Sequence, residues 1–116
     1  MRILLIVDDE PDLAAMLRRF LKRDFDEILE ARDRRRAEEL VSARPVTHLV
    51  LDAALPDGPA GAEVVRRWRA LAPSLGYAAI FSGQTPVSVP AQGVDAVFAK
   101  PDGLEDLLAA LRRRTG

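Results

Sequence analysis

Apolar residues in this chain fall into short blocks with two different spacings. Five consecutive aliphatic residues, Ile3 to Val7, are followed at once by three acidic residues. An unbroken run of this length is typical of a parallel strand covered on both faces. Pro11 then fits the first turn of a helix, where its missing N–H costs little. The apolar residues that follow recur on one helical face: Leu13, Met16, Leu17, Phe20 and Leu21. The chain therefore opens with a strand followed by a helix.

The same alternation continues to the end of the chain. It predicts further strands at 27–31, 46–51, 77–81 and 94–99, and further helices at 34–44 and 62–72. A final helix is marked by four leucines at helical spacing: Leu104, Leu107, Leu108 and Leu111. The strand at 27–31 is the most polar, as an exposed edge strand is. Five strands alternating with helices favour a doubly wound parallel sheet, and right-handed crossovers place helices on both faces.

One segment interrupts this rhythm. Between Ser82 and Gly93 the chain carries Gly83, Pro86 and Pro90 and few apolar residues. Proline inside a helix removes a hydrogen bond and clashes with the preceding turn, at a cost of about 3 kcal/mol or more. We therefore expect the helix between the fourth and fifth strands to be shortened or lost.

Composition narrows the class of protein. The 116 residues are 48% apolar and 30% charged, which fits one globular domain over residues 1–116. A net charge of −1 argues against a dedicated nucleic-acid binder. The chain has no cysteine, and its one histidine, His48, is expected to be structural. Thiolate and multi-histidine metal sites are thus excluded. No apolar run approaches the roughly 18 residues of a membrane span, and early acidic residues leave no room for a signal peptide, so we expect a cytoplasmic protein.

Polar side chains follow four of the five predicted strands. Asp8 and Asp9 follow the first, Asp52 the third, Ser82 the fourth and Lys100 the fifth. Ligands of open parallel sheets bind beyond the carboxyl ends of the strands, so these groups should converge on one rim. Three carboxylates raise one another's pKa unless a cation lies among them. Oxygen ligands suit Mg²⁺, and a lysine ammonium suits a phosphoryl oxygen.

Four segments carry these residues, each after an apolar strand: Ile6-Val7-Asp8-Asp9-Glu10-Pro11, Leu49-Val50-Leu51-Asp52 with Leu55-Pro56-Asp57-Gly58, Phe81-Ser82-Gly83, and Lys100-Pro101. In this order they resemble the receiver domain of two-component response regulators, over the whole length of the chain. The resemblance implies a flavodoxin-like, three-layer α/β/α sandwich. Its five-stranded parallel sheet would have the order 2-1-3-4-5, here with the fourth helix shortened or lost.

The resemblance also implies a set of site residues. Asp52 would be the phosphoryl acceptor. Asp9 and Asp52 would hold Mg²⁺, with the backbone carbonyl of Ala54 as a further ligand and Asp8 acting through water. The family often has a cis peptide bond between the lysine and the proline that follows it.

Ser82 would hydrogen-bond one phosphoryl oxygen and Lys100 would pair with another. The phosphoryl group would come from a sensor histidine kinase or a histidine phosphotransfer protein, and the signal would pass on through protein–protein contacts. The domain would then be a regulatory phosphoacceptor rather than an enzyme, with neither nucleic acid nor membrane as a partner. Because no effector domain follows Arg114, we expect it to act alone.

Two other functions stay open at this point. A pseudo-receiver has the same fold but binds partners without using phosphate; the presence of the whole acceptor set argues against it. A hydrolase of the aspartyl-phosphate phosphatase kind would have Asp-x-Asp after the first strand, where this chain has Asp8-Asp9-Glu10. The family usually has Tyr or Phe at the position of Val97. Phe98 is adjacent, but successive strand residues face opposite sides, so we expect the usual aromatic switch to be absent.

Overall fold

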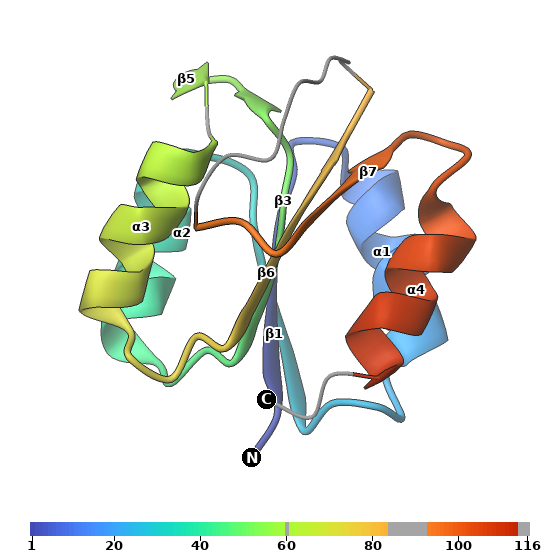
Figure 1. Cartoon of the computed structure of the whole chain (residues 1–116), viewed down its shortest axis with the longest axis horizontal. Coiled ribbons are helices and arrows are strands. Elements are labelled where there is room, and N and C mark those ends of the chain that lie inside the picture. Colours follow the sequence, from blue (N-terminus) through green and yellow to red (C-terminus); the bar gives the residue numbers. More distant parts are fainter. Residues whose placement is uncertain (60, 84–92, 114–116) are drawn as a thin grey trace.

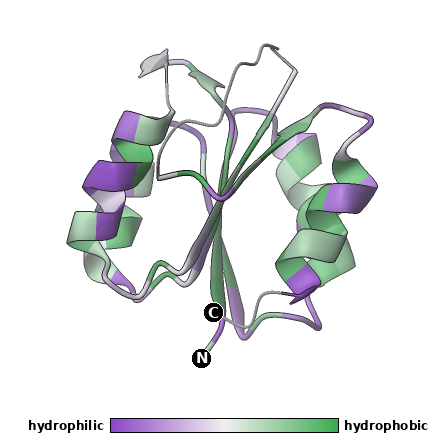
Figure 2. Cartoon of the chain, viewed as in Figure 1, coloured by the Kyte–Doolittle hydropathy of each residue, from purple (hydrophilic) through white to green (hydrophobic). Residues whose placement is uncertain are grey.

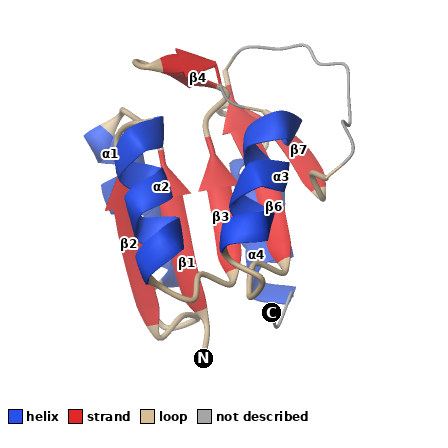
Figure 3. Cartoon of the chain, turned by 90° about the vertical axis from the view of Figure 1, so that its left-hand side faces the viewer, coloured by secondary structure: helices blue, strands red, loops and turns tan. Residues whose placement is uncertain are grey.

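A five-stranded parallel sheet forms the centre of the molecule. The computed structural model describes residues 1–59, 61–83 and 93–113. The sheet is ordered β2-β1-β3-β6-β7, and every pair of neighbours is parallel (Figure 3). Its strands are β1 (Ile3–Val7), β2 (Glu27–Ala31), β3 (His48–Leu51), β6 (Tyr77–Ser82) and β7 (Ala96–Ala99). Numbered within this sheet alone, the strands have the predicted order 2-1-3-4-5. The polar strand β2 lies at an edge, as its sequence indicated.

Helices cover both faces of the sheet (Figure 1). The described residues contain α1 (Pro11–Leu21), α2 (Arg34–Ala43), α3 (Ala62–Leu71) and α4 (Leu104–Arg113). α2 and α3 lie on one face, and α1 and α4 on the other, so the three-layer sandwich is confirmed. The expected loss of a helix after the fourth strand concerns residues 84–92, which lie outside the described residues. Among the helices described, the longest has 11 residues, against about 20 for a membrane span, and none could cross a bilayer.

Two apolar cores sandwich the sheet, and β1, β2, β3 and β6 contribute to both because successive side chains face opposite sides, whereas β7 contributes only to the core beneath α1 and α4. In β1, Ile3, Leu5 and Val7 face α2 and α3, whereas Leu4 and Ile6 face α1 and α4. All five are fully buried. This explains why an unbroken aliphatic run, rather than an alternating one, encodes the central strand. Figure 2 shows the same division, with hydrophobic strands between helices whose hydrophilic residues face outward.

A small hairpin follows β3 that the sequence pattern did not predict. Strands β4 (Ala54–Leu55) and β5 (Gly58–Pro59) pair antiparallel around a two-residue turn. Gly58 has φ +133°, a backbone conformation that side-chain-bearing residues rarely adopt. The hairpin lies beyond the carboxyl ends of the sheet strands (Figure 3), at the rim where the polar residues were expected to meet.

Element boundaries differ from the predictions by one or two residues. β3 begins at His48 rather than at residue 46, because the Val46 N–H bonds to the Arg44 carbonyl within a turn. β7 begins at Ala96 rather than at residue 94. His48 is fully buried, with its Nδ1 2.7 Å from Thr47 Oγ1, which supports the structural role expected of it.

Candidate functional site

The backbones of three site residues are fixed by the sheet itself. Each residue lies one position beyond a strand and extends the hydrogen-bond ladder. The Asp8 N–H donates to the last carbonyl of β2 at 3.0 Å, and the Asp52 N–H to the last carbonyl of β1 at 2.9 Å. The Lys100 N–H donates to the Ser82 carbonyl, at the end of β6, at 3.0 Å. The carboxyl ends of the five strands thus hold these groups at one rim.

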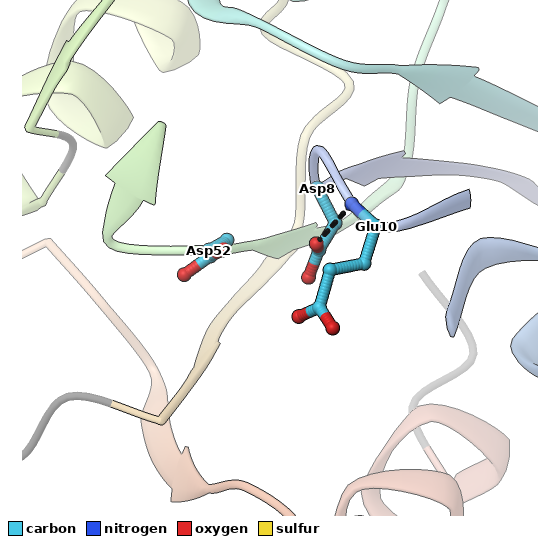
Figure 4. Close-up of side chains that lie close together, drawn as sticks. All are labelled: Asp8, Glu10 and Asp52. Carbon is cyan, nitrogen blue, oxygen red and sulfur yellow. Dashed lines mark hydrogen bonds between the residues drawn. The ribbon is translucent and has the colours of Figure 1, made fainter. Parts of the chain in front are cut away.

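The Lys100 ammonium lies at the centre of this rim. Its Nζ is 2.7 Å from Asp8 Oδ2, 3.0 Å from Glu10 Oε1 and 3.6 Å from Asp52 Oδ2. The side chains of Asp8 and Asp52 are only 3% and 8% exposed, whereas that of Glu10 is 64% exposed. Figure 4 shows the carboxylates at the ends of β1 and β3. The site is therefore a nearly buried pair of aspartates with one shared cation and one solvated glutamate.

Local turns orient both buried carboxylates. Asp8 Oδ1 accepts a hydrogen bond from the Glu10 N–H at 2.9 Å, drawn as a dashed line in Figure 4, and Asp52 Oδ1 accepts one from the Ala54 N–H at 3.1 Å. This is the turn in which an aspartate binds the backbone two residues further on. One oxygen of each carboxylate is thus committed to the backbone, and the other oxygen faces Lys100.

Burial and pairing act against each other at this site. Burial raises the pKa of Asp8 above its usual value, although the hydrogen bond from Lys100 opposes the shift. Burial alone would lower the pKa of Lys100, but its hydrogen bonds to Asp8 and Glu10 and the nearby charges of Asp8 and Asp52 outweigh this, so that the pKa is raised. Lys100 is therefore held in its charged form. Its single positive charge lies among three carboxylates, so it does not neutralise them all.

The acidic residues could hold a metal ion. Asp8, Glu10 and Asp52 each offer a carboxylate oxygen, and these oxygens lie within 4.8 Å of one another. Three carboxylate oxygens, two of them on buried side chains, suit a hard divalent cation, because Lys100 supplies only one positive charge among them. Asp9, expected as a direct ligand, is exposed and does not belong to this cluster of described residues. Glu10 was not singled out from the sequence; its one signal is that it follows two other acids after β1.

The remaining predicted residues lie around the same rim. Ser82 is the last residue of β6, is 5% exposed and pairs with Ala99 of β7. The Lys100–Pro101 peptide bond is cis, as expected. Val97 is 50% exposed, whereas Phe98 packs against the core beneath α1 and α4. The two residues therefore face opposite sides of β7, and Phe98 does not occupy the position of the usual aromatic residue.

A parallel three-layer sandwich with buried aspartates and a lysine at its carboxyl rim defines a class of regulatory phosphoacceptor domains. The family model of the response regulator receiver domain matches residues 4–112, so the chain belongs to this family. Domains of this family are generally regulatory phosphoacceptors rather than enzymes in the usual sense. No curated protein matches the chain in a sequence comparison.

Solved structures of receiver domains and response regulators share this fold. A response regulator from Burkholderia pseudomallei, described with a phosphorylated aspartic acid, a calcium ion and citrate, is 25% identical with a TM-score of 0.82; the match covers 99% of this chain and 68% of that one. The receiver domain of an HD-domain protein from Pseudomonas fluorescens is 23% identical with a TM-score of 0.81, covering 97% and 85%. A CheY-like receiver domain from Methylobacillus flagellatus is 22% identical with a TM-score of 0.76, covering 96% and 98%.

Proposed function

We propose that Asp52 accepts a phosphoryl group from a phosphohistidine of a sensor histidine kinase or a histidine phosphotransfer protein, in a Mg²⁺-dependent reaction in the cytoplasm. An Asp52 oxygen attacks the phosphorus and the P–N bond breaks. The ring nitrogen takes the electron pair of the broken bond; because the other ring nitrogen of the phosphohistidine carries a proton, the imidazole leaves as a neutral ring, and Asp52 carries an acyl phosphate. Attack by water on the phosphorus later releases inorganic phosphate and restores the carboxylate.

The chain's own residues neutralise and orient the transferred group. Lys100, 3.6 Å from Asp52 in the unphosphorylated protein, pairs with one phosphoryl oxygen. Ser82, at the end of the neighbouring strand, donates a hydrogen bond to another. Phosphoryl transfer needs positioning and charge stabilisation more than further covalent chemistry, which is what such a rim supplies.

Asp8, Glu10 and Asp52 are the described residues whose carboxylates would hold Mg²⁺. The Ala54 carbonyl would be a further ligand, as the family resemblance implies. When bound, the ion supplies positive charge for the carboxylates and for the phosphoryl oxygens. Asp9 stays a proposed ligand on the strength of the family resemblance, and its exposed side chain would have to turn toward the rim.

One observation carries this proposal: Lys100 bridges two buried aspartates from different strands, Asp8 and Asp52. A buried excess of carboxylates destabilises a protein, because burial disfavours their charged form, and groups perturbed in this way concentrate at functional sites. The phosphorylated aspartate in the Burkholderia pseudomallei relative supports the same chemistry.

The test is to incubate the protein with a small phosphodonor and Mg²⁺ and to measure its intact mass. We expect a gain of one phosphoryl group that Asp52→Ala abolishes and that Asp95→Ala, a change at an aspartate outside the rim, retains. Omission of Mg²⁺ should also abolish it. An unchanged mass of the wild-type protein with several donors contradicts the proposal and favours a pseudo-receiver.

We further propose that phosphorylation is retained without the usual aromatic switch, because Val97 has no ring and Phe98 faces the opposite core. Solution NMR spectra with and without a phosphoryl mimic test this. Large chemical-shift changes centred on Val97 and α4 would contradict it; changes confined to the rim would support it.

A further inference from the structure

The N-terminus of α2 is capped by two aspartates from different parts of the chain. Asp33, the ordinary N-cap residue, accepts a hydrogen bond from the Arg36 N–H at 2.8 Å. Asp57, 23 residues from Arg34, accepts hydrogen bonds from the Arg34 N–H at 3.0 Å and from the Arg35 N–H at 3.2 Å. The first N–H groups of a helix have no partner within it, so an aspartate from elsewhere can bind them firmly. Asp57 thereby joins α2 to the loop that follows the phosphoacceptor.

Asp57 lies in the turn of the β4–β5 hairpin, and the hairpin leads directly back to Asp52. Leu55 pairs with Gly58 and Ala54 pairs with Pro59, so the turn and the first residue of β4 belong to one small hairpin. The Ala54 N–H in turn donates to Asp52 Oδ1 at 3.1 Å. A movement of the turn therefore changes the position of the backbone that orients the Asp52 carboxylate.

Two further observations show that the turn is held closely against α2. A Cβ added at Gly58 would lie 3.1 Å from the Arg34 guanidinium, so the helix and the hairpin approach each other at a residue without a side chain. The hydrogen bond from the Arg34 N–H, supported by that from Arg35, also lowers the pKa of Asp57, although the residue is exposed. The contact thus selects the charged carboxylate.

We propose that Asp57 is a positioning residue for the phosphoacceptor site: by fastening the hairpin to the N-terminus of α2, it fixes the Ala54 backbone that orients Asp52 and that would bind Mg²⁺. This rests on the proposed function insofar as the rim binds Mg²⁺ for phosphoryl transfer. Substitution of a group that orients the ligands of a metal ion typically lowers the affinity of the site for that ion 10- to 100-fold. Asp57 acts on the site only through the Ala54 backbone, so we expect an effect at the lower end of this range.

The chain provides a matched control at the same helix end. Asp57→Ala and Asp33→Ala each remove capping hydrogen bonds from α2, and both should lower the melting temperature. Only Asp57→Ala should also weaken Mg²⁺ binding, about tenfold by calorimetric titration, with Asp33→Ala within about twofold of wild type. The Ala54 amide of the metal-free protein should exchange with solvent faster in Asp57→Ala alone. The Mg²⁺ affinity and the Ala54 exchange rate of Asp57→Asn should lie between those of wild type and Asp57→Ala, because one amide oxygen remains as an acceptor.

Phosphorylation adds a kinetic readout. With a small phosphodonor, Asp57→Ala should be slow at low Mg²⁺ and should approach the wild-type rate at saturating Mg²⁺, because its defect lies in positioning. Equal effects of Asp57→Ala and Asp33→Ala on Mg²⁺ affinity and on Ala54 exchange would overturn the inference, as would absence of Mg²⁺ binding by the wild type. If Asp57→Ala does not fold, Asp57→Asn decides between the same outcomes. If the wild type binds Mg²⁺ but takes up no phosphoryl group, the proposed function fails, while the titration and the exchange measurement still decide the role of Asp57.

Discussion

Replacement of Lys100 by methionine tests the electrostatic account of the rim. Methionine keeps most of the length and apolar stem of the side chain but removes the charge. Asp8 and Asp52 would then keep their buried carboxylates without the ammonium that lies 2.7 Å and 3.6 Å from them. We therefore expect Lys100→Met to destabilise the protein at neutral pH in the absence of divalent ions.

The size of the effect follows from burial. Removal of one partner from a fully buried ion pair costs about 3–5 kcal/mol, because a charge is left buried and unpaired. Lys100 is 16% exposed at its side chain and the two aspartates still less, so we expect slightly less, about 2–4 kcal/mol. For a chain of 116 residues this corresponds to a fall in melting temperature of roughly 8–16 °C.

Urea unfolding of wild type and variant, without Mg²⁺, measures this difference. Lys22→Met is the control, because Lys22 is the other lysine of the chain and is exposed at the end of α1; it should change the free energy of unfolding by less than about 0.5 kcal/mol. The difference in free energy of unfolding between wild type and Lys100→Met should shrink as the pH falls through the raised pKa of Asp8. Protonation of Asp8 then removes the buried charge that the substitution leaves unpaired.

Mg²⁺ should also reduce the difference in free energy of unfolding between wild type and Lys100→Met. At about 100 times its Kd, a ligand that binds only the native state stabilises it by about 2.7 kcal/mol. The variant should bind Mg²⁺ more tightly than wild type, since no ammonium competes for the carboxylates. The electrostatic account is wrong if the free energy of unfolding of Lys100→Met lies within about 0.5 kcal/mol of that of wild type at neutral pH. It is also wrong if Mg²⁺ does not reduce the difference between the two proteins.

Two further predictions concern other polar contacts. Thr47 Oγ1 accepts a hydrogen bond from the Ile3 N–H at 2.9 Å and donates to the Ile3 carbonyl at 3.0 Å. Thr47→Val leaves that buried N–H without this acceptor and should cost about 1–3 kcal/mol in urea unfolding, whereas Thr47→Ser should cost less; equal losses would contradict this. Asp57 has a lowered pKa, so its contribution to stability should be complete above pH 3.8 and should disappear as the pH falls through that lowered pKa. The stability difference between wild type and Asp57→Asn should narrow below pH 3.8, and a difference unchanged at low pH would refute the assignment.

Much of the fold could be predicted because it depends on local patterns. The run from Ile3 to Val7 is apolar at every position, and β1 is indeed buried on both faces at the centre of the sheet. The polar sequence of β2 indicated an edge strand, and β2 lies at the edge. The small hairpin after β3 was not predicted, since strands of two residues, β4 and β5, are too short to show a periodicity.

The candidate site was partly predictable for a similar reason. In a parallel sheet all carboxyl ends lie on one rim, so residues that directly follow strands must gather there. The order of strands and polar residues in the sequence is therefore enough to predict that Asp8, Asp52 and Lys100 lie together. It could not decide among the three consecutive acids after β1, because the turn at Asp8 determines which side chains face the rim. That turn leaves Asp9 exposed and brings Glu10 to Lys100.

The five strands of the sheet, the four described helices and the kinds of groups at the rim all follow from the amino-acid sequence, because hydrophobic spacing and the residues that end each strand are local properties. Which groups touch one another depends on how the chain packs in three dimensions. Lys100 reaches Asp8 across 92 positions, and Asp57 reaches the N-terminus of α2 across 23. Such contacts depend on strand register, helix packing and turn geometry acting together, and no single segment of the chain contains that information.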